Sequence, residues 1–144
     1  MEITVSPGRR FMGRLDQGED LLAGLERRGA EAGIRLGKVK AIGAVSRARF
    51  GYYDQTGRQY EFLEIPEPLE ILALLGNISL KDGKTMVHAH ITLADKEGRA
   101  CGGHLAEGTL VFACEYEIQE YLGEQPLARA FDQATGLFLW PPKQ

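Results

Sequence analysis

The stretch that decides the fold is MVHAHITLADKEGRACGGHL, residues 86–105. It reads as two short strands joined by a polar turn at residues 95–98. Successive side chains of a strand point to opposite faces of a sheet, so His88, His90 and Thr92 share one face. The other face is apolar and carries Val87, Ala89, Ile91 and Leu93. The sequence therefore predicts a half-buried β-hairpin with a site on its polar face.

All three histidines of the chain lie in this stretch, and their spacing suits a metal or anion site. Two positions along a strand separate the α-carbons of His88 and His90 by about 6.5–7 Å. Imidazoles at that spacing can converge on one ion, with Zn–N bonds of about 2.0–2.1 Å. The return strand brings His104 across from the pair, and Gly102-Gly103 leaves room for the approach. Three nitrogens with an open fourth position match a catalytic zinc site. The alternative is that the histidines form the solvated face of an edge strand.

Length and composition favour one globular domain over residues 1–144. The hydrophobic share is 44%, the charged share is 26% and the formal net charge is −3. This net charge argues against a polyanion partner, because nucleic-acid binding is driven by Lys and Arg. No apolar stretch approaches the ~18–20 residues of a membrane span, and no secretory signal is visible. We therefore expect a soluble, cytoplasmic protein with no membrane association, in which Cys101 and Cys114 are reduced.

The order of patterns along the chain predicts an α+β fold, a mostly antiparallel sheet with one main helix. A strand at 9–15 precedes an amphipathic helix at 19–32, with Asp16 as its cap and Gly33 at its left-handed end. Strands follow at 34–54, 59–64, 69–80 and 109–121, with a bend or bulge at Gly43. The hairpin that bears the histidines lies between the last two.

Three further segments carry expectations about surfaces. After Gly43, strict alternation puts Val45, Arg47 and Arg49 on one face, so Arg47 and Arg49 are candidates for contacting an anion or nucleic acid. Exposed arginines on a sheet are also common without such a role. The apolar run at 69–80 predicts a strand buried on both faces, covered by the helix or by another subunit. The apolar tail at 136–142, with Trp140, should dock on its own sheet or on a neighbour.

The chain resembles the plant- and prokaryote-conserved (PPC) domain family over nearly its whole length. The resemblance is carried by GRLDQGEDLLAGL, by EPLEILALLGNISLKDGK, and by VHAHITLADKEGRACGGHLAEGTLVFACEYEI with its His-x-His and Gly-Gly-His motifs. It implies a compact α+β domain that assembles as a homotrimer, with His88, His90 and His104 as ligands of a divalent metal, zinc being the first choice. Plant members join the domain to AT-hook segments that bind DNA, and stand-alone prokaryotic members are often labelled DNA-binding by analogy. Residues 7–10, PGRR, lack the order of an AT-hook core.

Three functions remain open from the sequence. The first is a homotrimeric binding module with a metal site and a regulatory role, whose partner is DNA or another protein. The second is a zinc-dependent, hydrolase-like enzyme that uses the His88, His90 and His104 site. The third is a purely structural metal. Asp95, Glu97 and Glu107 are the nearby carboxylates for an enzyme, but no pattern selects a catalytic residue among them. The sequence therefore leans away from an enzyme and leaves the matter undecided.

Overall fold

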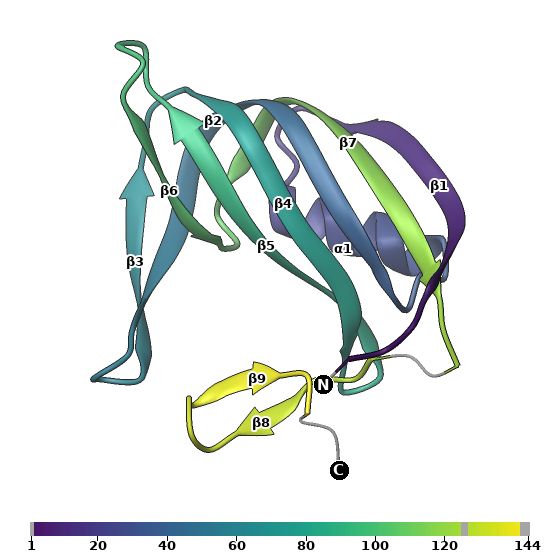
Figure 1. Ribbon diagram of the computed structural model, residues 1–144. Coiled ribbons are helices and arrows are strands. Elements are labelled where there is room, and N and C mark those ends of the chain that lie inside the picture. Colours follow the sequence, from purple (N-terminus) through teal and green to yellow (C-terminus); the bar gives the residue numbers. More distant parts are fainter. Residues whose placement is uncertain (1, 125–126, 142–144) are drawn as a thin grey trace.

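A curved antiparallel sheet with one helix across its inner face forms most of the protein (Figure 1). The computed structural model describes residues 2–124 and 127–141. In chain order the elements are β1 (Ser6–Leu15), α1 (Leu21–Glu31), β2 (Gly37–Asp54), β3 (Gln59–Ile65), β4 (Leu69–Lys81), β5 (Lys84–Ala94), β6 (Ala100–Leu105), β7 (Leu110–Leu122), β8 (Ala130–Asp132) and β9 (Leu137–Leu139). The predicted α+β fold with one main helix is confirmed.

The main sheet curves round, so that its long strand β2 pairs with β4 and β3 along one edge and with β7 and β6 along the other. The strand order is β1-β7-β2-β4-β5-β6, with β3 paired to β2. Beyond its pairing with β4, β2 also pairs with β6, through Phe50 opposite Leu105 and Gly51 opposite His104. This second pairing bends the sheet round at the end that bears the histidines. The hairpin of β5 and β6 is therefore held from both sides.

The helix α1 lies where the leucine pattern predicts, but its cap is a different residue. The side chain of Asp20, not of Asp16, accepts the Ala23 N–H at 3.0 Å. The Glu19 carboxylate accepts the Asp16 N–H at 3.2 Å, and this bond closes the turn before the helix. Asp20 also accepts the Gly108 N–H at 2.6 Å, which ties the start of α1 to the loop before β7. Gly33 ends the helix with φ of 67°, as expected.

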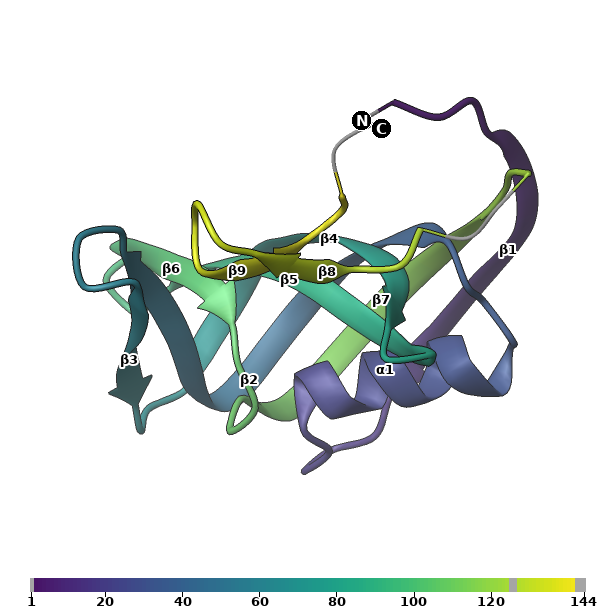
Figure 2. The same cartoon turned by 90° about the horizontal axis from the view of Figure 1, so that it is seen from below.

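The hydrophobic core lies between α1 and the inner face of the sheet (Figure 2). Leu21 and Leu25 of α1 are fully buried there, in the same core cluster as Leu74 and Ile78 of β4. The four apolar residues of β5 that the alternation grouped together are all buried: Val87, Ala89, Ile91 and Leu93. The apolar face of the hairpin is thus confirmed as core. Of the helices in the described ranges, none is long and apolar enough to cross a bilayer.

Two irregularities in β2 overturn the strict alternation expected after Gly43. Gly43 has φ of 139°, and a Cβ there would overlap the carbonyl oxygen of Ala113, so the predicted bulge is confirmed. The pairing of β2 with β7 shifts register on both sides of Val45. The first shift leaves Phe112 of β7 as the extra residue and the second leaves Ser46 of β2. Only the second reverses the faces of β2 beyond it. Val45 is consequently buried on the same side as Phe50, and the prediction that it shares a face with Arg47 is wrong.

Within the single chain, β4 is buried on one face over most of its length, and cover of the other face by another subunit stays a prediction. Leu74 is fully buried, whereas Leu72 and Leu75 are exposed by 53% and 67%. The helix covers the inner face alone, so the outer face of β4 has no layer over these leucines within the described chain. The apolar tail covers another part of the sheet. Its hairpin β8–β9 docks on its own chain, with the Lys81 amine 3.9 Å from the ring centre of Phe138.

Candidate metal centre

The three histidines converge on one point of the outer face, as the spacing predicts. His90 of β5 is the register partner of His104 of β6, and His88 lies two residues before His90. The ring centres are 5.0 to 5.6 Å apart. One ligand nitrogen from each ring can be chosen so that all lie within 4.8 Å of one another. Tetrahedral Zn–N bonds place the nitrogens about 3.3 Å apart, so small side-chain rotations would complete the geometry.

The protonation and bonding of the imidazoles suit a metal. The Nδ1 atom of His104 is buried and has no hydrogen-bond partner within the described residues. Burial lowers the pKa of His88 to about 4, and Arg129 and His90 act in the same direction. Burial likewise lowers the pKa of His104 to about 4, assisted by the other two imidazoles and by Arg129. Neutral rings have free lone pairs at neutral pH, which is the form that binds a metal.

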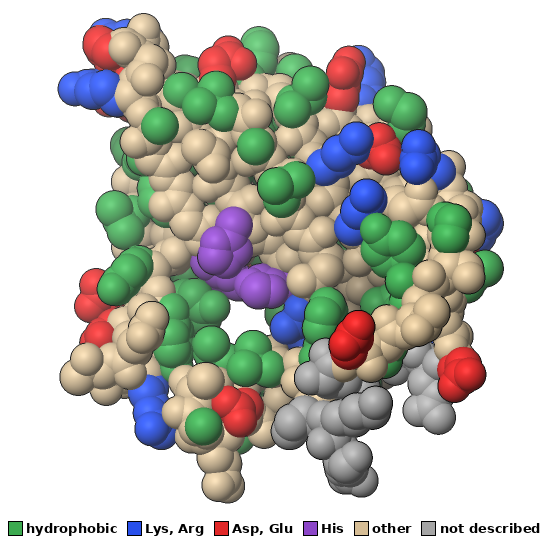
Figure 3. All heavy atoms as spheres, in the orientation of Figure 1, with side chains coloured by type: hydrophobic (Ala, Val, Ile, Leu, Met, Phe, Trp, Pro, Cys, Tyr) green, Lys and Arg blue, Asp and Glu red, His purple; other side chains and the backbone are tan. Residues whose placement is uncertain are grey.

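A cavity of about 560 Å³ opens beside the three histidines. Figure 3 shows it as the hollow next to the purple side chains, with Lys or Arg side chains at its edge. One wall comes from the end of β2 and the start of β3, where the Tyr60 ring lies 4.7 Å from that of His104. The opposite wall is the C-terminal segment, with Arg129 and residues of β9. The histidines are therefore the floor of a pocket rather than part of a flat solvated strand.

Arg129 is a pocket residue that no sequence pattern selects. Its guanidinium donates to Ser79 Oγ at 3.0 Å, to Asn77 Oδ1 at 2.7 Å and to the Phe138 carbonyl oxygen at 3.0 Å. Asn77 is the register partner of His88, so this arrangement holds the cation beside the histidines. Backbone bonds between residues 127–129 and Leu80 bring the segment to β4. A single Arg in an irregular stretch carries no periodic signal, so only the tertiary structure reveals it.

Comparison with known proteins identifies the family. The model of the Plants and Prokaryotes Conserved (PCC) domain matches residues 2–122. The chain belongs to the PCC domain family. This is the PPC family that the sequence motifs resemble. The segment that carries Arg129 lies beyond the matched range. The pocket therefore combines strands from inside that range with a wall formed by residues that follow it.

Relatives of this PCC domain include proteins of known structure. The metal-containing protein AF0104 from Archaeoglobus fulgidus is 44% identical, with a TM-score of 0.92 and 99% of each chain covered. The PPC protein from Pyrococcus horikoshii is 34% identical, with a TM-score of 0.92 and coverage of 98% and 96%. A protein from Bacteroides thetaiotaomicron described as a "putative DNA binding protein" is 23% identical, with a TM-score of 0.85 and coverage of 95% and 96%. That last likeness shows the fold alone.

A curated relative shows the PCC domain within a larger protein. The bifunctional protein GlmU of a Synechococcus species (strain JA-2-3B'a(2-13)) is 38% identical over 124 residues. These residues are 85% of this chain but only 18% of that protein. The chain thus spans less than a fifth of the length of this curated relative.

Arg47 and Arg49 of the PCC domain lie away from the histidine pocket and are engaged in ion pairs. Both approach the carboxylate of Glu64 in β3, at 3.2 and 3.4 Å. Arg49 also stacks 3.9 Å above the ring of Phe62. Their candidate role in binding nucleic acid stays a prediction, and any phosphate would have to compete with Glu64.

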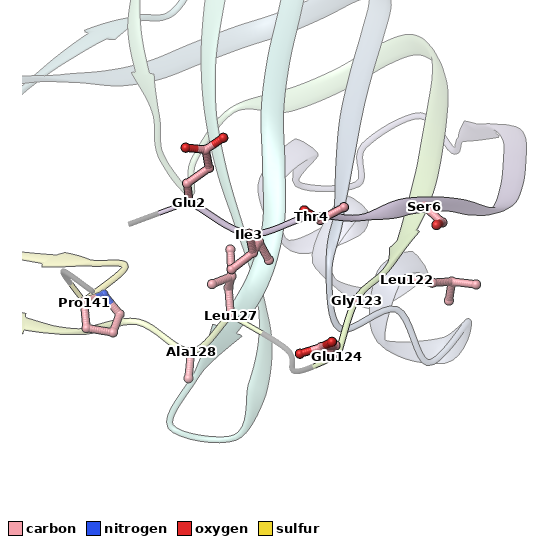
Figure 4. A pocket seen from close by; sticks show the side chains of 10 residues that line it. All are labelled: Glu2, Ile3, Thr4, Ser6, Leu122, Gly123, Glu124, Leu127, Ala128 and Pro141. Carbon is pink, nitrogen blue, oxygen red and sulfur yellow. The ribbon is translucent and has the colours of Figure 1, made fainter. Parts of the chain in front are cut away.

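A larger cavity, of about 860 Å³, lies at the chain ends and carries little chemistry (Figure 4). Its described lining consists of short or aliphatic side chains, with Glu2 and Glu124 as the ionisable groups. Figure 4 shows these residues coming from the N-terminal segment, from the chain at and after the end of β7 and, for Pro141, from the C-terminal segment. The cavity of about 560 Å³ beside the histidines is the functional candidate, because it gathers imidazoles and a buried cation.

Proposed function

We propose that this protein is a homotrimeric binding module in which His88, His90 and His104 hold a divalent metal ion, zinc being the first choice. The observation that carries the proposal is the convergence of three ligand nitrogens within 4.8 Å. The unpartnered buried Nδ1 of His104 adds support, because a buried polar atom without a partner is costly. The description of the A. fulgidus relative as metal-containing is consistent with it.

The donor set favours zinc or a neighbouring transition metal over magnesium or calcium. Imidazole nitrogens suit zinc, copper, iron and nickel, whereas magnesium and calcium prefer oxygen ligands. When bound, zinc polarises a ligand and lowers the pKa of bound water. The three imidazoles would hold the ion, and the Tyr60 ring packs against that of His104.

Binding is a better reading of this pocket than hydrolysis. A hydrolase-like reaction needs a general base near the metal. The described lining of the pocket contains no Asp or Glu. Of the three carboxylates suggested by the sequence, Asp95 pairs with Arg99 at 2.7 Å, and neither Glu97 nor Glu107 lines the pocket. An enzyme and a purely structural metal remain the alternatives that the experiments below test.

The outer face supports self-association. A row of register partners crosses the sheet on this face: Met12, Glu117, Lys40, Leu75, His90 and His104. Of the large exposed apolar side chains, Met12 and Leu75 lie in this row, and Ile42 and Leu72 lie two and three positions from it along their strands. Clustered exposed apolar side chains mark association surfaces. A trimer formed through this face would bring subunit contacts close to the metal site.

Zinc titration by calorimetry, together with the native mass, tests the proposal. We expect one zinc per chain, a trimeric mass, and loss of zinc binding in His90→Ala. The matched control is Thr92→Ala, since Thr92 follows on the same exposed face of β5. We expect Leu75→Glu to dissociate the trimer, because it places a charge in the apolar surface. A monomeric wild type, or zinc binding that survives His90→Ala, contradicts the corresponding part of the proposal.

DNA binding through Arg47 and Arg49 and a cytoplasmic location stay predictions, as does extension of the PCC domain over residues 1–144. A mobility-shift series at rising salt tests the first, because contacts to phosphates weaken steeply with salt. Arg47→Gln and Arg49→Gln should reduce any shift if these residues contact phosphate. Absence of a shift at the lowest salt would remove this role.

A further inference from the structure

The pocket beside the histidines has the features of a site for a small organic anion. We propose that it binds a molecule with a carboxylate or phosphoryl head and an apolar body, and that Arg129 receives the head. The inference rests on the proposed metal function in one respect, because the ion held by the histidines would supply a second contact to the same head. The partner is thus a small metabolite-sized anion rather than a macromolecule.

Arg129 is a buried cation without a counterion. The residue is only 9% exposed, and it forms no ion pair with any carboxylate in the described chain. Burial lowers the pKa of its guanidinium, although the group remains charged at neutral pH. Burying a charge is costly unless an opposite charge compensates it. An anion in the adjoining cavity would provide that compensation.

The orientation of Arg129 is fixed, and part of its bonding capacity is unused. An arginine side chain carries five N–H donors. Ser79, Asn77 and the Phe138 carbonyl accept three of them, one on each nitrogen. Each terminal nitrogen therefore keeps one N–H without a described protein acceptor. Two such groups on a planar guanidinium match the two oxygens of a carboxylate or phosphoryl group.

The rest of the pocket adds positive charge without negative charge. Lys81 lies in the lining and its amine packs over the Phe138 ring. Arg58 also lines the pocket, and its charge helps to lower the pKa of the nearby Asp132 carboxyl. No Asp or Glu belongs to the described lining. A pocket with cations, imidazoles and no carboxylate favours an anion over a neutral or cationic ligand.

The walls and the volume fit an apolar body attached to the anionic head. The described walls include aromatic and aliphatic side chains: Tyr53, Tyr60, Met86, Leu137, Phe138 and Leu139. The cavity of about 560 Å³ is of the size that holds small ligands. The head would lie toward Arg129 and the histidines, and the body along the wall formed by β9 and the two tyrosines.

Four matched probes test the inference on the full chain. They are benzoate, phenylphosphonate, benzamide and benzylamine, measured by calorimetry and by saturation-transfer NMR on zinc-loaded and on chelator-treated protein. We expect one or both anions to bind about tenfold or more tightly than benzamide and benzylamine, because hydrogen bonds to charged groups are the stronger ones. The two anionic probes tell a carboxylate ligand from a phosphoryl one. Chelator treatment should weaken anion binding without abolishing it.

Two pocket variants and one surface variant locate the site. Arg129→Gln should weaken the preferred anion about tenfold or more. Arg129 holds the C-terminal segment, so Lys81→Gln provides a second test that leaves those bonds in place, with a loss of a few fold. The control is Arg14→Gln, which removes the same charge from an exposed position on β1 and should change nothing.

The inference is overturned if neither benzoate nor phenylphosphonate binds more tightly than benzamide, or if anion binding is unaffected by both pocket variants. If zinc still binds in that case, the proposed metal function stands alone. If zinc does not bind while Arg129→Gln still weakens the anion, the metal function fails and the anion site is supported. The zinc titration and the anion titration therefore separate the two claims.

Discussion

The two faces of the β4–β5 pair differ sharply, although both faces belong to the same two strands. On the inner face, Leu74 and Ile78 are completely buried in the core under α1. On the outer face, the neighbouring Leu75 is 67% exposed and lies opposite His90. Alternation along a strand thus separates a face that stabilises the fold from a face that offers ligands and contacts.

The difference shows where function can be placed without loss of stability. The inner face is filled with apolar side chains, so a metal ligand there would require an unfavourable buried polar group. The outer face carries histidines, exposed leucines and the docked hairpin of β8 and β9. Substitutions on the two faces should therefore have effects of different size and kind.

The largest expected effect comes from truncating adjacent leucines of β4. Leu74→Ala should lower the free energy of unfolding by about 2–5 kcal/mol, because it leaves a cavity in the core. Leu75→Ala should cost much less, and its cost should depend on protein concentration if Leu75 lies in a subunit contact. Urea unfolding at two protein concentrations measures both. Equal, concentration-independent losses would remove the distinction between the faces.

Metal removal should have the next largest effect, and it should act through the outer face. A ligand present at a hundredfold its dissociation constant stabilises the folded state by about 2.7 kcal/mol. A chelator should therefore lower the melting temperature of the zinc-loaded protein by several degrees, roughly 3–4 °C for each kcal/mol. His90→Ala should show no response to chelator, whereas Thr92→Ala should respond like the wild type. An unchanged melting temperature in all three proteins would also argue against a structural metal.

A smaller effect is expected where the C-terminal hairpin docks on the outer side. The hydroxyl of Tyr53 donates to the carbonyl oxygen of Thr135 at 2.6 Å. Tyr53→Phe should cost about 0.5–1.5 kcal/mol of local docking energy and speed hydrogen exchange in β8 and β9. Tyr52→Phe is the matched control, since the Tyr52 side chain is exposed. Equal rates of hydrogen exchange in Tyr53→Phe and Tyr52→Phe would show that the bond from Tyr53 to Thr135 does not hold the hairpin.

The smallest effect is a pH-dependent one at the contact between α1 and β5. Glu26 accepts the Val87 N–H at 3.0 Å, and burial raises the pKa of its carboxyl, with Glu107 and Asp20 adding repulsion. Because the folded state favours the protonated form, stability falls as pH rises through the raised pKa. Glu26→Gln should therefore gain up to about 1 kcal/mol at neutral pH and nothing below the ordinary carboxyl pKa.

Urea unfolding at neutral pH and at a pH below the ordinary carboxyl pKa measures the Glu26 effect. Glu31→Gln, on the same helix, is the control because Glu31 is exposed. A gain that persists in acid would show that the cause is packing rather than ionisation of Glu26.

Much of the fold and the whole histidine group could be predicted from local patterns. The alternation in β5 placed Val87 and Ile91 in the core and His88 with His90 opposite, because the side-chain period of a strand is fixed by its backbone. The turn at 95–98 then brought His104 within reach. The prediction for Val45 is wrong because the extra residue that follows it in β2, Ser46, results from pairing with β7. Such shifts leave no periodic trace in one strand.

The sequence by itself determined the strands of the main sheet, the amphipathic helix and the gathering of three imidazoles in one hairpin, since these depend on neighbours close along the chain. Only the tertiary structure decided that Arg129 lies beside His88. It also decided that Arg47 and Arg49 pair with Glu64, and that one face of β4 stays uncovered. Each of these contacts joins segments that are distant in sequence. Their positions depend on how the sheet bends and where the last segment docks, which no local period encodes.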